Sequence, residues 1–149
     1  MAPRYNTLML DTRTFKSIIE ELIPFNRLLG LKLENFDMET GNVTTRLEMR
    51  PEYLGNARRA MPHGGLLSFL IDATAGASAA LSLDDYSLID RVATIDMRVD
   101  YLKPAQGEVL LTASEVMRPG NRIINVRSEI HDDAGTLVAL GSNTFNVAR

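Results

Sequence analysis

The strongest constraint on the fold of this chain is a run from Gly64 to Leu83 in which Asp72 is the only charged residue. A helix that is apolar on all sides is buried, either in a protein core or in a membrane. A membrane span is disfavoured, because Asp72 near its middle would cost about 2.5–3.5 kcal/mol on insertion and two more acidic residues follow the run directly. The sequence therefore predicts a buried helix over residues 65–82.

Six segments with the character of β-strands surround this helix in the sequence. Residues 94–104 give the clearest pattern, because apolar and charged side chains alternate there with the period of two that is typical of a strand. Turn-prone stretches at 39–42, 118–121 and 132–135 favour hairpins, and therefore antiparallel pairing. The other five strands are expected at residues 31–38, 42–50, 107–117, 122–132 and 136–147.

Two further segments complete the expected architecture. Residues 14–25 predict a short amphipathic helix, which Thr14 can cap and Pro24 is expected to end. Residues 50–62 contain two prolines and a Gly-Asn pair, so they are expected to form an irregular loop. The apolar face of the short helix would consist of Phe15, Ile18, Ile19, Leu22 and Ile23.

The order of these elements indicates an α+β fold in a single domain over residues 1–149. A sheet of about six mostly antiparallel strands must cover its apolar face, and only the central helix is apolar enough to do so. We therefore expect a curved sheet wrapped around one long helix, with a short helix near the N-terminus.

Composition excludes several classes of site. The chain has no cysteine, which excludes disulfides, thiolate metal sites and a cysteine nucleophile. With only His63 and His131 available, we expect no metal site, and we expect no cofactor. The net charge of −3 favours neither nucleic acid nor an anionic membrane as a partner. Residues 1–16 lack the apolar core of a signal peptide, so we expect a cytoplasmic location.

The lone carboxylate of Asp72 needs an explanation, because an ionised buried carboxylate without a partner is very costly. It is paired, protonated or open to a water-filled cleft. One interpretation is purely structural, with Asp72 bound to a neighbouring backbone group or hydroxyl. The other interpretation is functional, and the residues that precede the helix favour it.

His63, Gly64 and Gly65 stand immediately before the helix. Glycines there leave backbone N–H groups uncovered at the positive end of the helix dipole, where they can bind an anion or a developing oxyanion. The simpler role for His63 is structural, with the side chain shaping the loop rather than transferring a proton.

Gly64 and Asp72 are eight residues apart, which corresponds to about 12 Å along a helix. One reacting carbonyl group cannot contact both within one chain. If the two residues act together, they belong to different subunits across a two-fold axis. A six-stranded sheet also has edges to bury, so we expect a homodimer with its sites at the interface.

The segment "PHGGLLSFLIDATAGASAAL" resembles the central part of hotdog-fold acyl-CoA thioesterases of the PaaI type, which are related to 4-hydroxybenzoyl-CoA thioesterases. These proteins carry H-G-G, a few apolar residues and then L-x-D, which His63, Gly64, Gly65, Leu70 and Asp72 match here. The order of elements agrees over about residues 14–147. The resemblance implies hydrolysis of an acyl-CoA to the free acid and coenzyme A, in a homodimer or a dimer of dimers.

The resemblance also implies roles for single residues. Asp72 would act as general base or as nucleophile, and the Gly64 N–H would polarise the thioester carbonyl. Asn56 matches a polar residue that holds water in the family, although it stands one residue further from the histidine than in some relatives. Thr94 matches a Ser or Thr that contacts the catalytic water or acid, and an ordinary strand threonine is an equally good interpretation.

Coenzyme A carries phosphates, so basic residues are expected at the mouth of the cleft. Each of these residues alone is more simply a solvated surface charge, and only the group indicates a nucleotide site. The basic candidates are Arg58, Arg59, Lys103, Arg118 and Arg122, and Gly120 in the 118–121 turn is the uncharged candidate for the same site.

Two other functions stay open. A hotdog hydratase or dehydratase acting on acyl thioesters would pair His63 with a carboxylate for proton transfer. A non-catalytic acyl-CoA binding or sensing module would keep the fold without the reaction. The acyl group, the choice between dimer and tetramer, and the choice between base and nucleophile for Asp72 are also open.

Overall fold

A computed structural model describes residues 10–149, and the first nine residues, which begin the segment tested for a signal peptide, lie outside the described part. Six antiparallel strands form one sheet in the order β1-β2-β6-β7-β8-β5. The expected strands and the α+β class are thereby confirmed. The strands are β1 Lys32–Phe36, β2 Val43–Glu48, β5 Val92–Tyr101, β6 Val109–Arg118, β7 Ile123–His131 and β8 Leu137–Val147.

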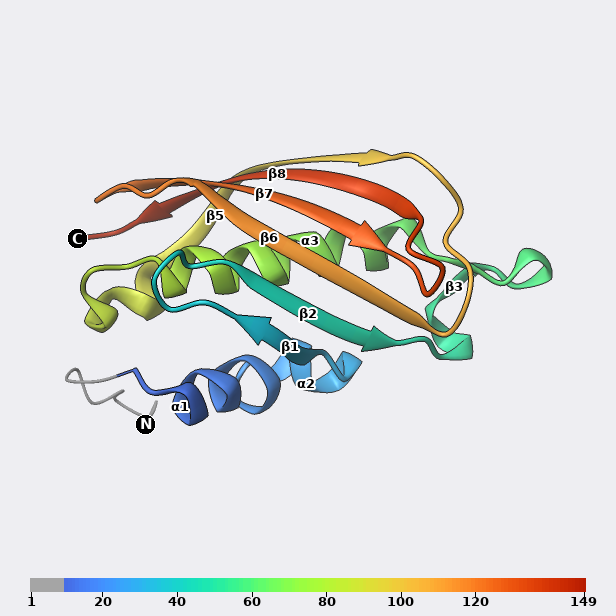
Figure 1. Cartoon of the computed structure of the whole chain (residues 1–149), viewed down its shortest axis with the longest axis horizontal. Coiled ribbons are helices and arrows are strands. Elements are labelled where there is room, and N and C mark those ends of the chain that lie inside the picture. Colours follow the sequence, from blue (N-terminus) through green and yellow to red (C-terminus); the bar gives the residue numbers. More distant parts are fainter. Residues whose placement is uncertain (1–9) are drawn as a thin grey trace.

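The central helix α3, Gly64–Leu81, lies along the inner face of the curved sheet, as Figure 1 shows. It begins and ends one residue before the range predicted from the sequence. This arrangement of one long helix and a wrapped antiparallel sheet is the hotdog fold that the resemblance implied. Although α3 is long and apolar enough to cross a membrane, 61% of it is buried inside the molecule, so the protein core accounts for its composition.

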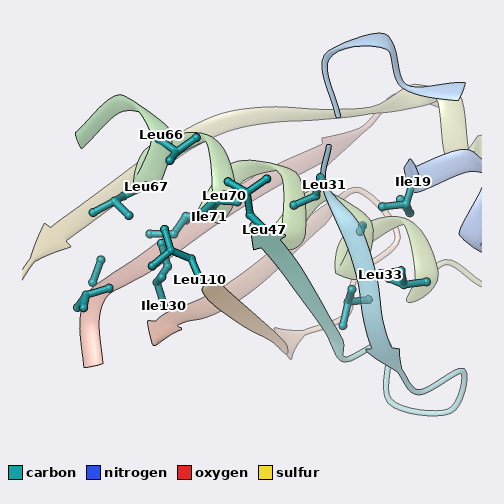
Figure 2. Packing of buried hydrophobic residues seen from close by; sticks show 14 of the residues in the cluster. Ile19, Leu31, Leu33, Leu47, Leu66, Leu67, Leu70, Ile71, Leu110 and Ile130 are labelled. Atoms are coloured by element: carbon teal, nitrogen blue, oxygen red, sulfur yellow. The ribbon is translucent and has the colours of Figure 1, made fainter. Parts of the chain in front are cut away.

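Close packing between α3 and the sheet depends on the absence of a side chain at Gly141 on β8. A Cβ atom there would clash with Cγ2 of Ile71, which no side chain could tolerate without movement. Ile71 and Leu70 are fully buried and point towards Leu110 of the sheet in Figure 2. The glycine at position 141 therefore allows Ile71 of α3 to pack directly against β8.

Buried hydroxyl groups fix the position of α3 on the sheet. Thr74 of α3 shares a hydrogen bond of 2.7 Å with Thr45 of β2, and Ser78 donates to the Gly41 carbonyl at 2.7 Å. These buried hydroxyl groups of α3 are thereby paired, as the low dielectric of the core favours. Rotation of α3 about its axis would break both bonds, so the side chains on its opposite face are held in place.

The N-terminal helical region is longer than predicted and is broken into three parts. These are α1 Thr12–Ser17, a π-helical turn η1 Ile18–Leu22 and α2 Pro24–Leu29. Pro24 was expected to end the helix, but it begins α2, because the first position of a helix needs no N–H donor. The expected cap Thr14 is also wrong, since Asp11 is the N-cap and accepts a hydrogen bond from the Thr14 N–H at 2.7 Å.

The segment 50–62 was expected to be an irregular loop, and the structure corrects this. It contains the short helices η2 Pro51–Tyr53 and η3 Ala57–Arg59, and the strands β3 Leu54–Asn56 and β4 Met61–Pro62. The two strands pair with each other, and the ribbon that they form projects beyond the start of α3 (Figure 1). A short 3-10 helix, η4 Tyr86–Arg91, also follows α3 and was not predicted.

Candidate active site

A cavity of about 610 Å³ lies beside α3, between this helix, the N-terminal helical region and the edge strand β5. The N-terminal region contributes a wall of apolar side chains that includes Ile18, Ile19 and Ile23, and η4 and β5 contribute further walls. Small residues of α3 give the cavity its depth, because Gly76 and Ala80 leave room where larger side chains would fill it. The cavity is therefore mainly apolar, with a few polar groups at defined points, which is the usual character of a small-molecule site.

Asp72 is one of those polar groups. It is half-buried in the middle of α3 and lines the cavity. Its Oδ1 atom accepts a hydrogen bond from Thr94 Oγ1 at 2.8 Å and another from Asn143 Nδ2 at 3.3 Å. Within residues 10–149, no protein donor is bound to Oδ2. The carboxylate is thus anchored through one oxygen atom, while the side chain borders open space.

A bulge in β5 turns Thr94 towards Asp72. Strict alternation would place Thr94 and Met97 on opposite faces of the strand, yet both line the cavity. The register between β5 and β8 shifts between Thr94 and Asp96, which inserts one extra residue and changes the alternation. Bulges are frequent at sheet edges and beside active sites, where they redirect a side chain. The structure therefore brings together two residues that the sequence analysis singled out, Asp72 and Thr94.

The start of α3 is organised by His63. Its Nδ1 atom accepts a hydrogen bond from the Gly65 N–H at 2.8 Å, so the imidazole is the N-cap of the helix. The Gly65 N–H is consequently occupied. In the described part of the chain, no hydrogen bond uses the N–H of Gly64, which leaves that amide as the candidate for binding a carbonyl oxygen.

Tyr101, at the end of β5, covers the start of α3. Its hydroxyl group lies 2.5 Å from Ser68 Oγ and donates to the Gly64 carbonyl at 3.3 Å. A Cβ atom on Gly64 would touch the tyrosine ring at 3.6 Å. β5 therefore contacts α3 at two points, with Thr94 at Asp72 and Tyr101 at Gly64.

The remaining predicted site residues lie outside the cavity lining. Asn56 is exposed on the projecting ribbon, where its Oδ1 atom caps η3 by accepting from the Arg59 N–H at 3.2 Å. Arg58 belongs to the same exposed helical turn, and Lys103 is exposed just beyond β5. The ribbon and the end of β5 both lie at the end of the molecule where α3 begins (Figure 1).

The other predicted basic residues lie at the opposite end of the molecule. Arg118 and Arg122 are exposed on either side of the turn between β6 and β7. Gly120 of that turn lines a small cleft with Ser82, next to the C-terminal end of α3. Since α3 spans Gly64–Leu81, the two basic groups of one subunit are separated by about 27 Å of helix.

Sequence reasoning missed Asn143, the second donor to Asp72. It also missed the contacts of Tyr101 and Ser68 at the helix start. Asn143 and Tyr101 lie outside the quoted segment, Ser68 lies within it among apolar residues, and only the strand register shows which side of β8 carries Asn143. Residues 10–149 contain no cluster of three His, Asp or Glu side chains that could hold a metal ion.

Residues 62–139 match the family model of the thioesterase superfamily. The medium/long-chain acyl-CoA thioesterase YigI of Escherichia coli is 31% identical over 135 residues, covering 84% of this chain and 86% of that protein.

Solved structures agree with the fold. A protein from Shewanella oneidensis related to the thioesterase superfamily is 34% identical, with a TM-score of 0.79 over 91% of this chain and 94% of that one. Zebrafish thioesterase superfamily member 2 is 20% identical, with a TM-score of 0.78 over 94% of this chain and all of that one (100%), and shares the fold.

Proposed function

The chain belongs to the thioesterase superfamily, and from this premise we propose that it hydrolyses an acyl-CoA thioester to the free acid and coenzyme A. The proposal rests on the position of Asp72, whose carboxylate is anchored by Thr94 through one oxygen and borders an apolar cavity. Such a site offers a base or nucleophile beside a space for an acyl chain.

The reaction needs few groups. As a general base, Asp72 takes a proton from water while the water oxygen attacks the carbonyl carbon. The C–S bond then breaks and the thiolate leaves. Asp72 returns the proton to the thiolate, which becomes the free thiol of coenzyme A. As a nucleophile, the carboxylate attacks the carbonyl carbon itself and expels the thiolate, and water hydrolyses the resulting anhydride. In both routes the Gly64 N–H of a partner subunit stabilises the negative charge that develops on the carbonyl oxygen.

The proposed dimer is supported by the edge strand β5. It pairs only with β8 among the described strands, and most of its side chains are exposed, including Ile95 at 59%. A long uncovered edge of this kind is a template for pairing with another chain.

Antiparallel pairing of two β5 strands about their middle would place the Thr94 end of one strand beside the Tyr101 end of the other. Asp72 of one subunit would then approach Gly64 of its partner, as the spacing along α3 requires. The same symmetry would bring Arg118 and Arg122 of one subunit towards Arg58 of the other, and so assemble a basic region for the phosphates of coenzyme A.

We also propose that the acyl group is medium to long, as the name of the Escherichia coli relative states for that protein. The apolar part of the cavity extends along α3 from Asp72 to Ala80, which is about 12 Å at the rise of a helix. A hydratase or dehydratase is less well supported, because His63 does not line the cavity and its Nδ1 atom caps α3.

The test is thiol release from butanoyl-, octanoyl-, dodecanoyl-, palmitoyl- and benzoyl-CoA, with wild type beside Asp72→Asn. We expect wild type to release coenzyme A, and Asp72→Asn to lose a factor on the order of 1,000 or more in kcat, since the base or nucleophile is removed. The variant should keep its unfolding midpoint. Binding of acyl-CoA without thiol release would indicate a binding module, and hydration of enoyl-CoA without thiol release would indicate a hydratase.

A further inference from the structure

The inner face of β8 is apolar at every position except one. Ala139, Gly141, Phe145 and Val147 are buried in alternation along this strand. Asn143 occupies the same face between Gly141 and Phe145 and is only 2% exposed. The alternation along the strand therefore predicts an apolar side chain at position 143, where the chain has an asparagine.

The amide of Asn143 is only half satisfied. Its Nδ2 atom donates to Asp72 Oδ1 at 3.3 Å, whereas its Oδ1 atom is buried without a hydrogen-bond partner in the described part of the chain. A buried acceptor that lacks a partner costs about 1–3 kcal/mol, and an apolar side chain of similar shape would avoid that cost. Stability alone is therefore a poor reason for an asparagine here.

The one bond that Asn143 makes is directed at the carboxylate of the site. Thr94 from β5 and Asn143 from β8 both donate to the same oxygen of Asp72, and they come from adjacent strands. A single donor leaves a carboxylate free to rotate about its Cβ–Cγ bond. Two donors that converge on Oδ1 from different strands restrict this rotation, and they leave Oδ2 as the oxygen that can meet water or the thioester.

We propose that Asn143 is a positioning residue, which holds Asp72 in the orientation that hydrolysis requires. The inference rests on the proposed function, since it assumes that Asp72 acts on the thioester. Asn143 itself contacts neither water nor substrate in this scheme, so its removal should reduce the rate of the chemical step and leave substrate binding intact.

The experiment is a double-mutant cycle measured by release of coenzyme A from dodecanoyl-CoA. It compares wild type, Asn143→Leu, Asp72→Asn and the double variant, and leucine keeps the branched shape of the amide while removing its donor. The matched control is Thr112→Val, because Thr112 on β6 is the other buried residue in residues 10–149 with an unpartnered side-chain atom.

We expect Asn143→Leu to lower kcat about ten- to a hundredfold with little change in KM, since a misplaced catalytic group loses rate of this order. In the Asp72→Asn background the same change should cost nothing further. The unfolding midpoint of Asn143→Leu should stay at or above that of wild type, and Thr112→Val should keep the kcat of wild type. If leucine does not fold, Asn143→Ala gives the same comparison.

Wild-type kcat in Asn143→Leu, or an equal loss in both backgrounds, would overturn the positioning role while leaving the proposed function in place. A wild-type protein that releases no thiol would overturn the proposed function and this inference with it. The two failures are therefore distinguishable within one set of measurements.

Discussion

Replacement of Gly76 by larger residues should shorten the acyl chain that the protein accepts. Gly76 lies on α3, one turn beyond Asp72, and lines the apolar part of the cavity. A Cβ atom there would meet only the ring of Phe145, at 3.7 Å and beyond, which is ordinary van der Waals contact. The backbone therefore tolerates a side chain, and most of its volume would extend into the cavity.

The magnitude follows from the area of the acyl chain that loses burial. Each methylene removed from water is worth about 0.8 kcal/mol. If the side chain of Gly76→Leu displaces roughly three methylenes of a long acyl chain, the loss is about 2.4 kcal/mol, or on the order of 50-fold in kcat/KM. Gly76→Ala should displace about one methylene and cost roughly fourfold. Butanoyl-CoA should be affected little, because it does not reach this part of the cavity.

The assay is kcat/KM for butanoyl-, octanoyl- and dodecanoyl-CoA across wild type, Gly76→Ala and Gly76→Leu. Unfolding midpoints provide the control for stability, and they should rise, since glycine in a helix is about 0.8–1 kcal/mol less favourable than alanine. An equal loss on all three substrates would show that the acyl chain does not occupy this cavity. Unchanged activity on dodecanoyl-CoA would refute the reasoning equally.

Two other predictions concern the edge strand and a buried carboxylate. Ile95→Lys on β5 should convert a dimer to a monomer in analytical ultracentrifugation, because a charge blocks edge pairing. The variant should lose thiol release and keep the circular dichroism spectrum of wild type. A fully active monomer would contradict a site shared between two subunits. Burial pushes the pKa of Asp132 up, but hydrogen bonds from the backbone N–H groups of Thr136, Gln106 and Ala134 hold it below 3.8. The native state therefore gains stability from ionised Asp132 above pH 3.8 and loses it as the pH falls through the lowered pKa. Asp132→Ala should cost about 3 kcal/mol in urea unfolding at pH 7, and a gap to wild type that did not narrow below pH 3.8 would be inconsistent with this origin.

The apolar run was sufficient to predict the central helix, and alternation together with turn-prone stretches was sufficient to predict the six strands. The run around Asp72 is too apolar for any exposed element, and the alternation from Ile95 to Tyr101 leaves little choice but a strand. Pro24 was misinterpreted because the same residue can end one helix and begin the next, and sequence alone does not separate the two cases. The strands of the ribbon at 54–62 are too short to show any period.

The candidate site was less accessible to sequence reasoning. Asp72 and Gly64 stood out by charge and by position before a helix, and the resemblance supplied Thr94. The bulge that turns Thr94 inward leaves no mark in the sequence, and Asn143 stands in a strand that also carries Ser142 and Thr144. Only the register of β8 against its neighbours separates the buried amide from the polar side chains that face away.

The wall of the cavity and the carboxylate of the site come from different parts of the chain. Ile18, Ile19 and Ile23 precede the part of the sequence that matches the family model, whereas Asp72 lies within it. The wall is held on the body of the protein by the burial of Ile18 and Ile19 in the main core and by the bond of 2.9 Å from the Leu33 N–H to Glu20. Substitutions in that wall would therefore change the shape of the cavity and leave the carboxylate of the site in place.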